Sequence, residues 1–307
     1  MQTLFHNPYR KKHGHWIRVN FHCHCRESSP CSSVSLAESV RMYHDIGTHC
    51  LAITDHDVVT NLDQVRRQYR DMIFLEGFEY SRAENILFIG ETVGSLIHLP
   101  LNKAVANANG ALAIICHPQP KNDNEYWSRD KIVALERLPD GIEIYNGHYG
   151  VERLRASGHT PIYTHLWDIL LTEGIVLWGF ANDDFHDLPD FNNAFNMVLV
   201  EHIAAEDIVR AAKNGCTYAS TGLLIESISE GQESIQVTTK TTCEGRFIGP
   251  HGKMLSTATG RCFEYHLTTE QYVRFEGTGE AGSLFLQPMF REHAPSSSSG
   301  AEAVNAR

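Results

Sequence analysis

Two histidines stand close together in the stretch Ile17–Cys25, which reads Ile-Arg-Val-Asn-Phe-His-Cys-His-Cys. Apolar and polar residues alternate as far as Phe21, which is the two-residue period of a strand. At that period His22 and His24 project to one face, and the cysteines beside them project to the other. Two imidazoles on one face suit a shared metal ion or cluster, although such a pair is also common in a loop after a buried strand. The metal interpretation therefore depends on the other strand ends.

Four other predicted strands also end in imidazoles or carboxylates. A βα-barrel brings the carboxyl ends of its strands to one face, so these side chains are predicted to converge. Nitrogen and oxygen ligands with no obligatory sulfur suit Zn, Mn or Fe, and the set exceeds the needs of one four-coordinate ion. The sequence therefore predicts two or three divalent metal ions, bridged by Glu79 or Asp184. The predicted ligands are His22, His24, His56, Glu79, His117, Asp184 and His186.

A centre of this kind activates water and clamps both oxygens of a displacement at phosphorus. A small anionic substrate also needs donors that fix its orientation, and the planar fork of Arg suits phosphate. Arg82 follows Glu79 on the loop that leaves its strand, and Arg26 follows the first histidine pair. His148, just past another predicted strand, is suited to protonate a leaving oxygen. The alternative for each of these residues is a solvated loop position.

Two aspartates flank one of the predicted ligands. Asp55 and Asp57 stand on either side of His56, where a carboxylate can orient a metal ligand from behind. A cap or turn residue is the alternative for both. The predicted catalytic residues are Asp55, Arg82 and His148.

The elements that position these residues alternate along the chain. Strands are predicted over 17–21, 49–53, 72–75, 86–89, 111–116, 141–145, 175–180, 195–200 and 216–219. Helices are predicted over 35–47, 61–70, 101–109, 130–138, 161–172 and 205–214. This alternation predicts an α/β fold with a parallel sheet and helices outside it. About seven or eight such units fit a closed or distorted βα-barrel better than an open sheet.

Composition limits the classes of function. The chain has 307 residues, 42% of them hydrophobic, and no apolar run long enough to span a membrane. The net charge of −11 argues against a broad nucleic-acid surface. The eight cysteines form no tight framework and the first residues resemble no secretory signal, which predicts a reducing, cytoplasmic location. Cys23, Cys25 and Cys31 could be thiolate ligands, but there is no Cys-x-x-Cys, and packing as small hydrophobes is favoured.

The ends of the chain differ from its middle. Residues 223–291 contain short alternating stretches with frequent glycine, which predicts a small antiparallel β domain. Residues 292–307 are rich in serine and alanine and are predicted to be a disordered tail. Residues 1–16 are predicted to form a loose, surface-exposed arm, and residues 17–222 to form the βα-barrel.

Together, the strand-end motifs resemble those of the PHP (polymerase and histidinol phosphatase) superfamily. The motifs are His22-Cys23-His24, Thr54-Asp55-His56-Asp57, Gly77-Phe78-Glu79, Cys116-His117-Pro118 and Asp184-Phe185-His186. Over residues 17–222 the resemblance implies a distorted (β/α)7 barrel, a two- or three-metal centre and hydrolysis of phosphoesters. Tyr272-Val273-Arg274-Phe275 and Leu286-Gln287-Pro288-Met289-Phe290 resemble the small C-terminal β domain of one bacterial branch.

The chain departs from the family pattern at two positions. The family often has Ser-Asp-Gly after the first histidine pair, with the Asp as a ligand, where this chain has Ser28-Ser29-Pro30. Asn85 stands where the family often has a histidine, and His98 further along is either its substitute or a surface residue. The main prediction is a metal-dependent phosphoesterase. The alternatives are a degenerate barrel that binds metal or ligand without turnover, and a hydrolase of non-phosphate esters or amides.

Overall fold

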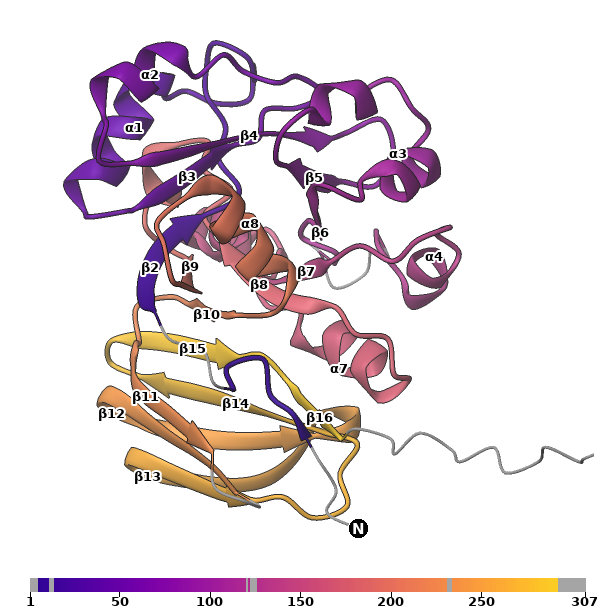
Figure 1. The fold of residues 1–307 in the computed structure, drawn as a ribbon, viewed down its shortest axis with the longest axis vertical. Coiled ribbons are helices and arrows are strands. Elements are labelled where there is room, and N and C mark those ends of the chain that lie inside the picture. The colour runs from indigo at the N-terminus through magenta and orange to yellow at the C-terminus, as the bar shows by residue number, and fades with distance from the viewer. Residues whose placement is uncertain (1–4, 11–13, 120, 122–125, 231–233, 292–307) are drawn as a thin grey trace, which may run out of the picture.

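The computed structural model describes residues 5–10, 14–119, 121, 126–230 and 234–291. Figure 1 shows the strands that alternate with helices at one end of the molecule and the strands from β11 onward at the other. No helix in these ranges is long and apolar enough to cross a membrane.

One run of neighbouring strands carries the predicted metal ligands. Its order is β10-β9-β2-β3-β4-β5-β6-β7-β8. β2-β3-β4 and β6-β7-β8 are parallel, as predicted. The strands are β2 (His15–Asn20), β3 (Cys50–Ile53), β4 (Ile73–Tyr80), β5 (Ile86–Ile89), β6 (Leu112–Ile115), β7 (Gly141–Asn146), β8 (Trp178–Asn182), β9 (Phe195–Val200) and β10 (Thr217–Ser220).

Three strands depart from the predicted parallel sheet. β5 is antiparallel to both of its neighbours, β9 is antiparallel to β2, and β10 is antiparallel to β9. The link of residues 81–85 between β4 and β5 is too short for a parallel crossover, which needs about a dozen residues. Within the described ranges no ladder joins β8 to β2; an isolated bridge joins Cys23 to Phe185 beyond their ends. Closure into a barrel therefore stays a prediction.

Helices lie between these strands, close to the predicted positions. They are α1 (Leu36–Asp45), α2 (Asp63–Gln68), α3 (Leu101–Asn107), α4 (Arg129–Val133), α5 (Gly147–Gly150), α6 (Glu152–Ala156), α7 (Thr164–Thr172) and α8 (Ala205–Lys213). Ser35 caps α1 as predicted, because its side chain accepts a hydrogen bond from the backbone N–H of Glu38. The same helix buries Val40 and Tyr43 against the sheet side. The short helices α5 and α6 were not predicted.

The C-terminal strands form the predicted antiparallel β structure. They are β11 (Ile225–Glu230), β12 (Ser234–Gly249), β13 (Lys253–His266), β14 (Tyr272–Gly279), β15 (Gly282–Leu286) and β16 (Met289–Arg291). Phe247, Phe263 and Phe275 are among the residues of their apolar core. β15 also pairs with β10, so hydrogen bonds continue from one group of strands into the other.

A buried ion pair also joins the two groups of strands. Arg274 on β14 donates from Nε and Nη2 to the two carboxylate oxygens of Asp168 on α7, at 2.8 and 2.7 Å. The Tyr272 hydroxyl donates to the same carboxylate at 2.8 Å. Arg274 is 2% exposed and Asp168 is 5% exposed, so this contact is shielded from water.

The described part of the N-terminal segment is packed, so its prediction as a loose arm is wrong there. β1 (Phe5–His6) pairs with β16, and Tyr9 is buried. The Tyr9 hydroxyl donates to the carbonyl oxygen of Thr217 at 2.7 Å. Residues 1–4 and the predicted disordered tail at 292–307 lie outside the described residues.

Candidate metal centre

Four ligand atoms meet at the carboxyl ends of β2, β4 and β8. His22 Nε2 lies 3.1 Å from His24 Nε2 and 3.1 Å from Asp184 Oδ1. His24 Nε2 lies 3.2 Å from the same Asp184 oxygen. Glu79 Oε2 lies 3.4 Å from both imidazole nitrogens. All four residues are at most 2% exposed, so their polar atoms have little access to water.

The two carboxylates of this group fit a cation. Glu79 Oε2 and Asp184 Oδ1 are buried and have no hydrogen-bond partner among the described residues. A buried, unpartnered carboxylate oxygen is costly unless a cation neutralises it. Ligand bonds of about 2.0–2.2 Å place neighbouring ligand atoms about 3.0–3.5 Å apart around one ion. The five distances above, from 3.1 to 3.4 Å, each join an imidazole nitrogen to the other imidazole or to a carboxylate oxygen, and they match that spacing.

A carboxylate that the sequence analysis did not select orients the first histidine. Glu143, on β7, is fully buried, and its Oε1 lies 2.9 Å from His22 Nδ1. The Nδ1–H therefore points at Glu143, and the Nε2 lone pair points into the ligand group. Glu143 Oε2 also accepts the backbone N–H of His117 at 2.7 Å. An acidic residue within an otherwise apolar strand was the available signal, because a buried carboxylate needs partners.

His117 and Asn85 lie at the other oxygen of Glu79. His117 Nε2 is 3.2 Å from Glu79 Oε1, and the Asn85 side-chain amide donates to that oxygen at 2.7 Å. Asn85 therefore contacts the Glu79 carboxylate from the position where the resemblance expects a histidine. His98 does not take that place: its Nδ1 lies 3.3 Å from Arg82 Nη2.

A second group contains His24, His56 and His186, whose ligand atoms lie within 4.8 Å of one another. The His24 ring stacks on His56 and His186, with centroids 4.5 and 4.2 Å away. His56 Nδ1 hydrogen-bonds Ser81 Oγ at 2.7 Å and lies 2.9 Å from Glu79 Oε2. All seven predicted ligands thus lie in one connected cluster.

Charges inside the cluster set the protonation of its members. Burial acts to lower the pKa of His22, but Asp184, Glu79 and Glu143 raise it well above its ordinary value. Burial acts to raise the pKa of Glu79, but the neighbouring histidines bring it well below its ordinary value. Burial and His186 lower the pKa of His24 to about 4. The carboxylates are therefore ionised and His24 is neutral, which are the states that bind metal, whereas His22 with its raised pKa must release a proton to bind an ion.

Three residues of this region adopt a backbone conformation that is uncommon outside glycine. Their φ angles are +25° at His117, +51° at Asp184 and +53° at Asp57. Such conformations cost of order 1–3 kcal/mol each and persist only where the surroundings enforce them. Two of the three carry predicted ligands, which indicates that the local fold holds these side chains in place.

The three predicted catalytic residues lie in different surroundings. Asp55 is buried, and its oxygens accept the backbone N–H of Cys25 at 2.8 Å and the Thr60 hydroxyl. Asp55 therefore holds the loop after β2 in place.

His148 lies beside the cluster. Its Nδ1 is 3.0 Å from Asp190 Oδ2, and its ring centroid is 4.9 Å from that of His186.

The two arginines lie further out. The side chain of Arg82 is 43% exposed, and its Nε lies 3.9 Å from Asp57 Oδ1. Arg26 is exposed and donates to the carbonyl oxygen of Ser33. Among the described residues, both side chains contact residues outside the seven predicted ligands, at the rim of the cluster.

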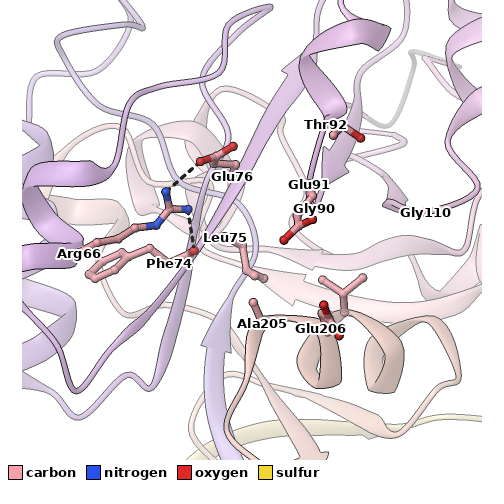
Figure 2. Close-up of a pocket in the computed structure, with 11 residues that line it drawn as sticks. Arg66, Phe74, Leu75, Glu76, Gly90, Glu91, Thr92, Gly110, Ala205 and Glu206 are labelled. Carbon is pink, nitrogen blue, oxygen red and sulfur yellow. Dashed lines mark hydrogen bonds and ion pairs between the residues drawn. The ribbon is translucent and has the colours of Figure 1, made fainter.

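Two cavities lie in different places relative to the cluster. A cavity of about 700 Å³ is lined by Ser33, Val151, Glu152, Arg153 and residues 187–190. It lies beside the cluster, because Asp190 in its lining accepts the backbone N–H of His186 at 3.0 Å. Figure 2 shows another, of about 660 Å³, lined by the first residues of β4 and by α8. There Arg66 pairs with Glu76 at 2.9 Å. Glu79 is near the other end of β4, so this second cavity is away from the cluster.

Comparison with known proteins gives a likeness in structure. No protein-family model matches the chain, and no curated protein matches its sequence significantly. One similar solved structure is a two-domain protein from Bacteroides vulgatus that contains a predicted PHP-like metal-dependent phosphoesterase. It is 18% identical, with a TM-score of 0.55, over 94% of this chain and 98% of that one.

Two other structures match about half of the chain. An amidohydrolase from Chromobacterium violaceum with bound sulfate is 16% identical, with a TM-score of 0.38, over 55% of this chain and 88% of that one. A candidate metal-dependent phosphoesterase from Bifidobacterium adolescentis is 15% identical, with a TM-score of 0.39, over 55% and 87%. Only the first likeness is close enough to describe the fold. This chain therefore shares the overall fold of the Bacteroides vulgatus protein.

Proposed function

We propose that this chain is a metal-dependent phosphoesterase of the PHP type, with its metal centre at the cluster of seven histidines and carboxylates. The observation that carries the proposal is the pair of buried carboxylate oxygens without hydrogen-bond partners among the described residues, on Glu79 and Asp184. They face two imidazole nitrogens at distances suited to one shared ion.

The residues divide into overlapping ligand sets. His22, His24, Glu79 and Asp184 would hold one ion, and Glu79 with His117 would hold part of a second. His56 and His186 would hold a third with the carboxylates beside them. Two or three divalent ions, Zn, Mn or Fe, fit this mixed nitrogen and oxygen set. When bound, such ions acidify water and neutralise charge on phosphoryl oxygens.

The chain's own residues supply binding and proton transfer. The cavity beside Asp190 offers room for the organic part of a small phosphoester. Arg153 in its lining and Arg82 at the rim are placed to hold negative charge. His148, whose Nδ1 lies 3.0 Å from Asp190 Oδ2, is the proposed proton donor to the leaving oxygen.

An activity panel tests the proposal. The metal-loaded protein should hydrolyse one or more of a set of phosphomonoesters, phosphodiesters, carboxyl esters and anilides, with phosphoesters preferred. His24→Ala and Asp184→Asn should each abolish turnover without unfolding the protein. His202→Ala and Asp130→Asn are matched controls, because both side chains are largely exposed, and they should keep the wild-type rate.

Two results would redirect the proposal. Tightly bound ions without turnover of any compound would support the alternative of a barrel that binds metal without catalysis. Preferred hydrolysis of anilides or carboxyl esters would keep the metal centre and reject the phosphoester.

A further inference from the structure

The cavity of about 700 Å³ lies between two short segments that adjoin residues of the proposed active site. On one side, Val151 follows α5 and donates its backbone N–H to the carbonyl oxygen of His148 at 3.3 Å. On the other side is η2 (Leu188–Asp190), which begins just after His186. Asp190 at the end of η2 accepts the backbone N–H of His186 at 3.0 Å. The cavity therefore lies beside both the proposed proton donor and a predicted metal ligand.

One wall of this cavity is apolar and is formed by Val151, Leu188 and Pro189. Leu188 is 59% exposed, the largest exposed fraction among the large hydrophobic residues that the structure describes as exposed. A single exposed leucine is ordinary on a protein surface. Ligand cavities, however, are typically about 300–1,000 Å³ in volume and are lined mostly by apolar side chains, with a few polar groups that orient the ligand. Leu188 is therefore placed to contact the hydrocarbon part of a ligand.

The charged side chains of the lining are mostly acidic. They are Glu152, Asp187, Asp190 and Arg153. Asp190 is buried, and its Oδ2 accepts the backbone N–H groups of His186 and Asp187 at 3.0 and 2.9 Å, so this carboxylate is held in place at the cavity wall. Three carboxylates beside one guanidinium disfavour a second anionic group on a substrate whose phosphate lies at the metal centre.

We propose that this cavity binds the alcohol part of the substrate, that this part is an uncharged and largely apolar group, and that Leu188 is a specificity-determining residue. The proposal rests on the proposed function and deepens it, because it names the substrate class. The substrates are phosphoesters of apolar alcohols, and compounds with several phosphate or carboxylate groups are disfavoured. The phosphate lies at the metal centre, the ester oxygen lies near His148, and the hydrocarbon chain lies against Leu188.

A series of linear alkyl phosphates, from ethyl to hexyl phosphate, tests the proposal on the metal-loaded protein. The leaving alcohols are chemically alike, so differences in kcat/KM report contacts of the chain. The value should rise about two- to fourfold for each added CH₂ group, the upper figure corresponding to full burial. Leu188→Ser should lower the hexyl-to-ethyl ratio of kcat/KM by about 3- to 10-fold, because the chain loses its apolar contact.

Ile203→Ser is the matched control. Ile203 is another exposed apolar residue, 46% exposed, and it lies between β9 and α8, outside the cavity. This variant should keep the wild-type hexyl-to-ethyl ratio. A hexyl phosphate whose chain ends in a carboxylate should be hydrolysed with a kcat/KM at least about tenfold lower than that of hexyl phosphate. A preference for the carboxylate compound would overturn the proposal.

The failure of this proposal and that of the proposed function are distinguishable. If phosphoesters are hydrolysed with no dependence on chain length, or if Leu188→Ser keeps the dependence, the proposal is wrong while the proposed function stands. If no phosphoester is hydrolysed, the proposed function fails, and the binding of alkylphosphonates to the metal-loaded protein decides. Hexylphosphonate should then bind more tightly than ethylphosphonate, and Leu188→Ser should reduce the difference. Equal affinities of the two phosphonates would reject the cavity as the site of the alcohol part.

Discussion

Glu143 orients His22, the first predicted ligand of the cluster, while remaining outside the cluster. Its carboxylate lies against His22 Nδ1 and accepts the backbone N–H of His117, so one side chain fixes two neighbouring strand ends. Glu143→Gln should weaken metal binding by about 10- to 100-fold, because it removes the charge behind the ligand. A metal titration followed by competition with a chelator measures this. Glu91→Gln, on the surface away from the cluster, is the control and should leave the metal affinity unchanged. A Glu143→Gln variant that binds metal as tightly as the wild-type protein would show that Glu143 does not support the site.

Arg82 is predicted to hold the negative charge of the phosphoester substrate. Arg82→Ala should lower kcat/KM for a phosphoester by roughly 10²-fold, about 2.7 kcal/mol of transition-state stabilisation. Metal content should not change, because the contacts of Arg82 are with His98 and Asp57. Arg67→Ala on α2 is the exposed control. An unaltered kcat/KM would assign Arg82 to the solvated surface.

At the residue scale the sequence predicted that the seven side chains converge, and it did not predict the residues that support them. The seven predicted ligands follow strands, and strand ends converge whichever partners surround them. The supporting residues contact partners that are distant along the chain. These contacts join Glu143 to His22, Asn85 to Glu79 and Asp190 to His148. Their roles depend on the packing of the strands and loops, which residue spacing does not encode.

At the scale of elements, the periodicity of apolar residues predicted where the strands and helices lie. It did not predict the direction in which each strand runs. A strand has the same two-residue period in either direction, so the pattern did not reveal that β5, β9 and β10 are antiparallel to their neighbours. The short link before β5 was the one local signal of a reversal. Helix caps were more informative, because Ser35 marks the start of α1 through its own hydrogen bond.

The α1 cap gives a prediction for stability. Ser35→Ala should destabilise the fold by about 1 kcal/mol, since the first turn of α1 loses its side-chain acceptor. Urea denaturation at equilibrium, with the metal content held constant, measures the change. Ser33→Ala, two residues earlier and outside the helix, should change stability by much less. Equal effects of both variants would show that the cap contributes nothing specific.

At the scale of the whole molecule, the buried pair of Arg274 and Asp168 connects β14 to α7. Arg274→Met should destabilise the protein by about 3–5 kcal/mol, because it leaves the Asp168 carboxylate buried without its cation. The double variant Arg274→Met with Asp168→Leu should recover most of that loss. Denaturation curves of the three proteins check this. A double variant as unstable as the single one would mean that the ion pair itself supplies the stability.

The central claim is that the convergent strand ends form a metal centre, and elemental analysis of the gently purified protein tests it most directly. We expect between one and about three transition-metal ions per chain, since the cluster exceeds the needs of one four-coordinate ion. His24→Ala and Asp184→Asn should each lower that number, and His202→Ala should not. Negligible Zn, Mn and Fe in the wild-type protein, with none regained on reloading, would contradict the account.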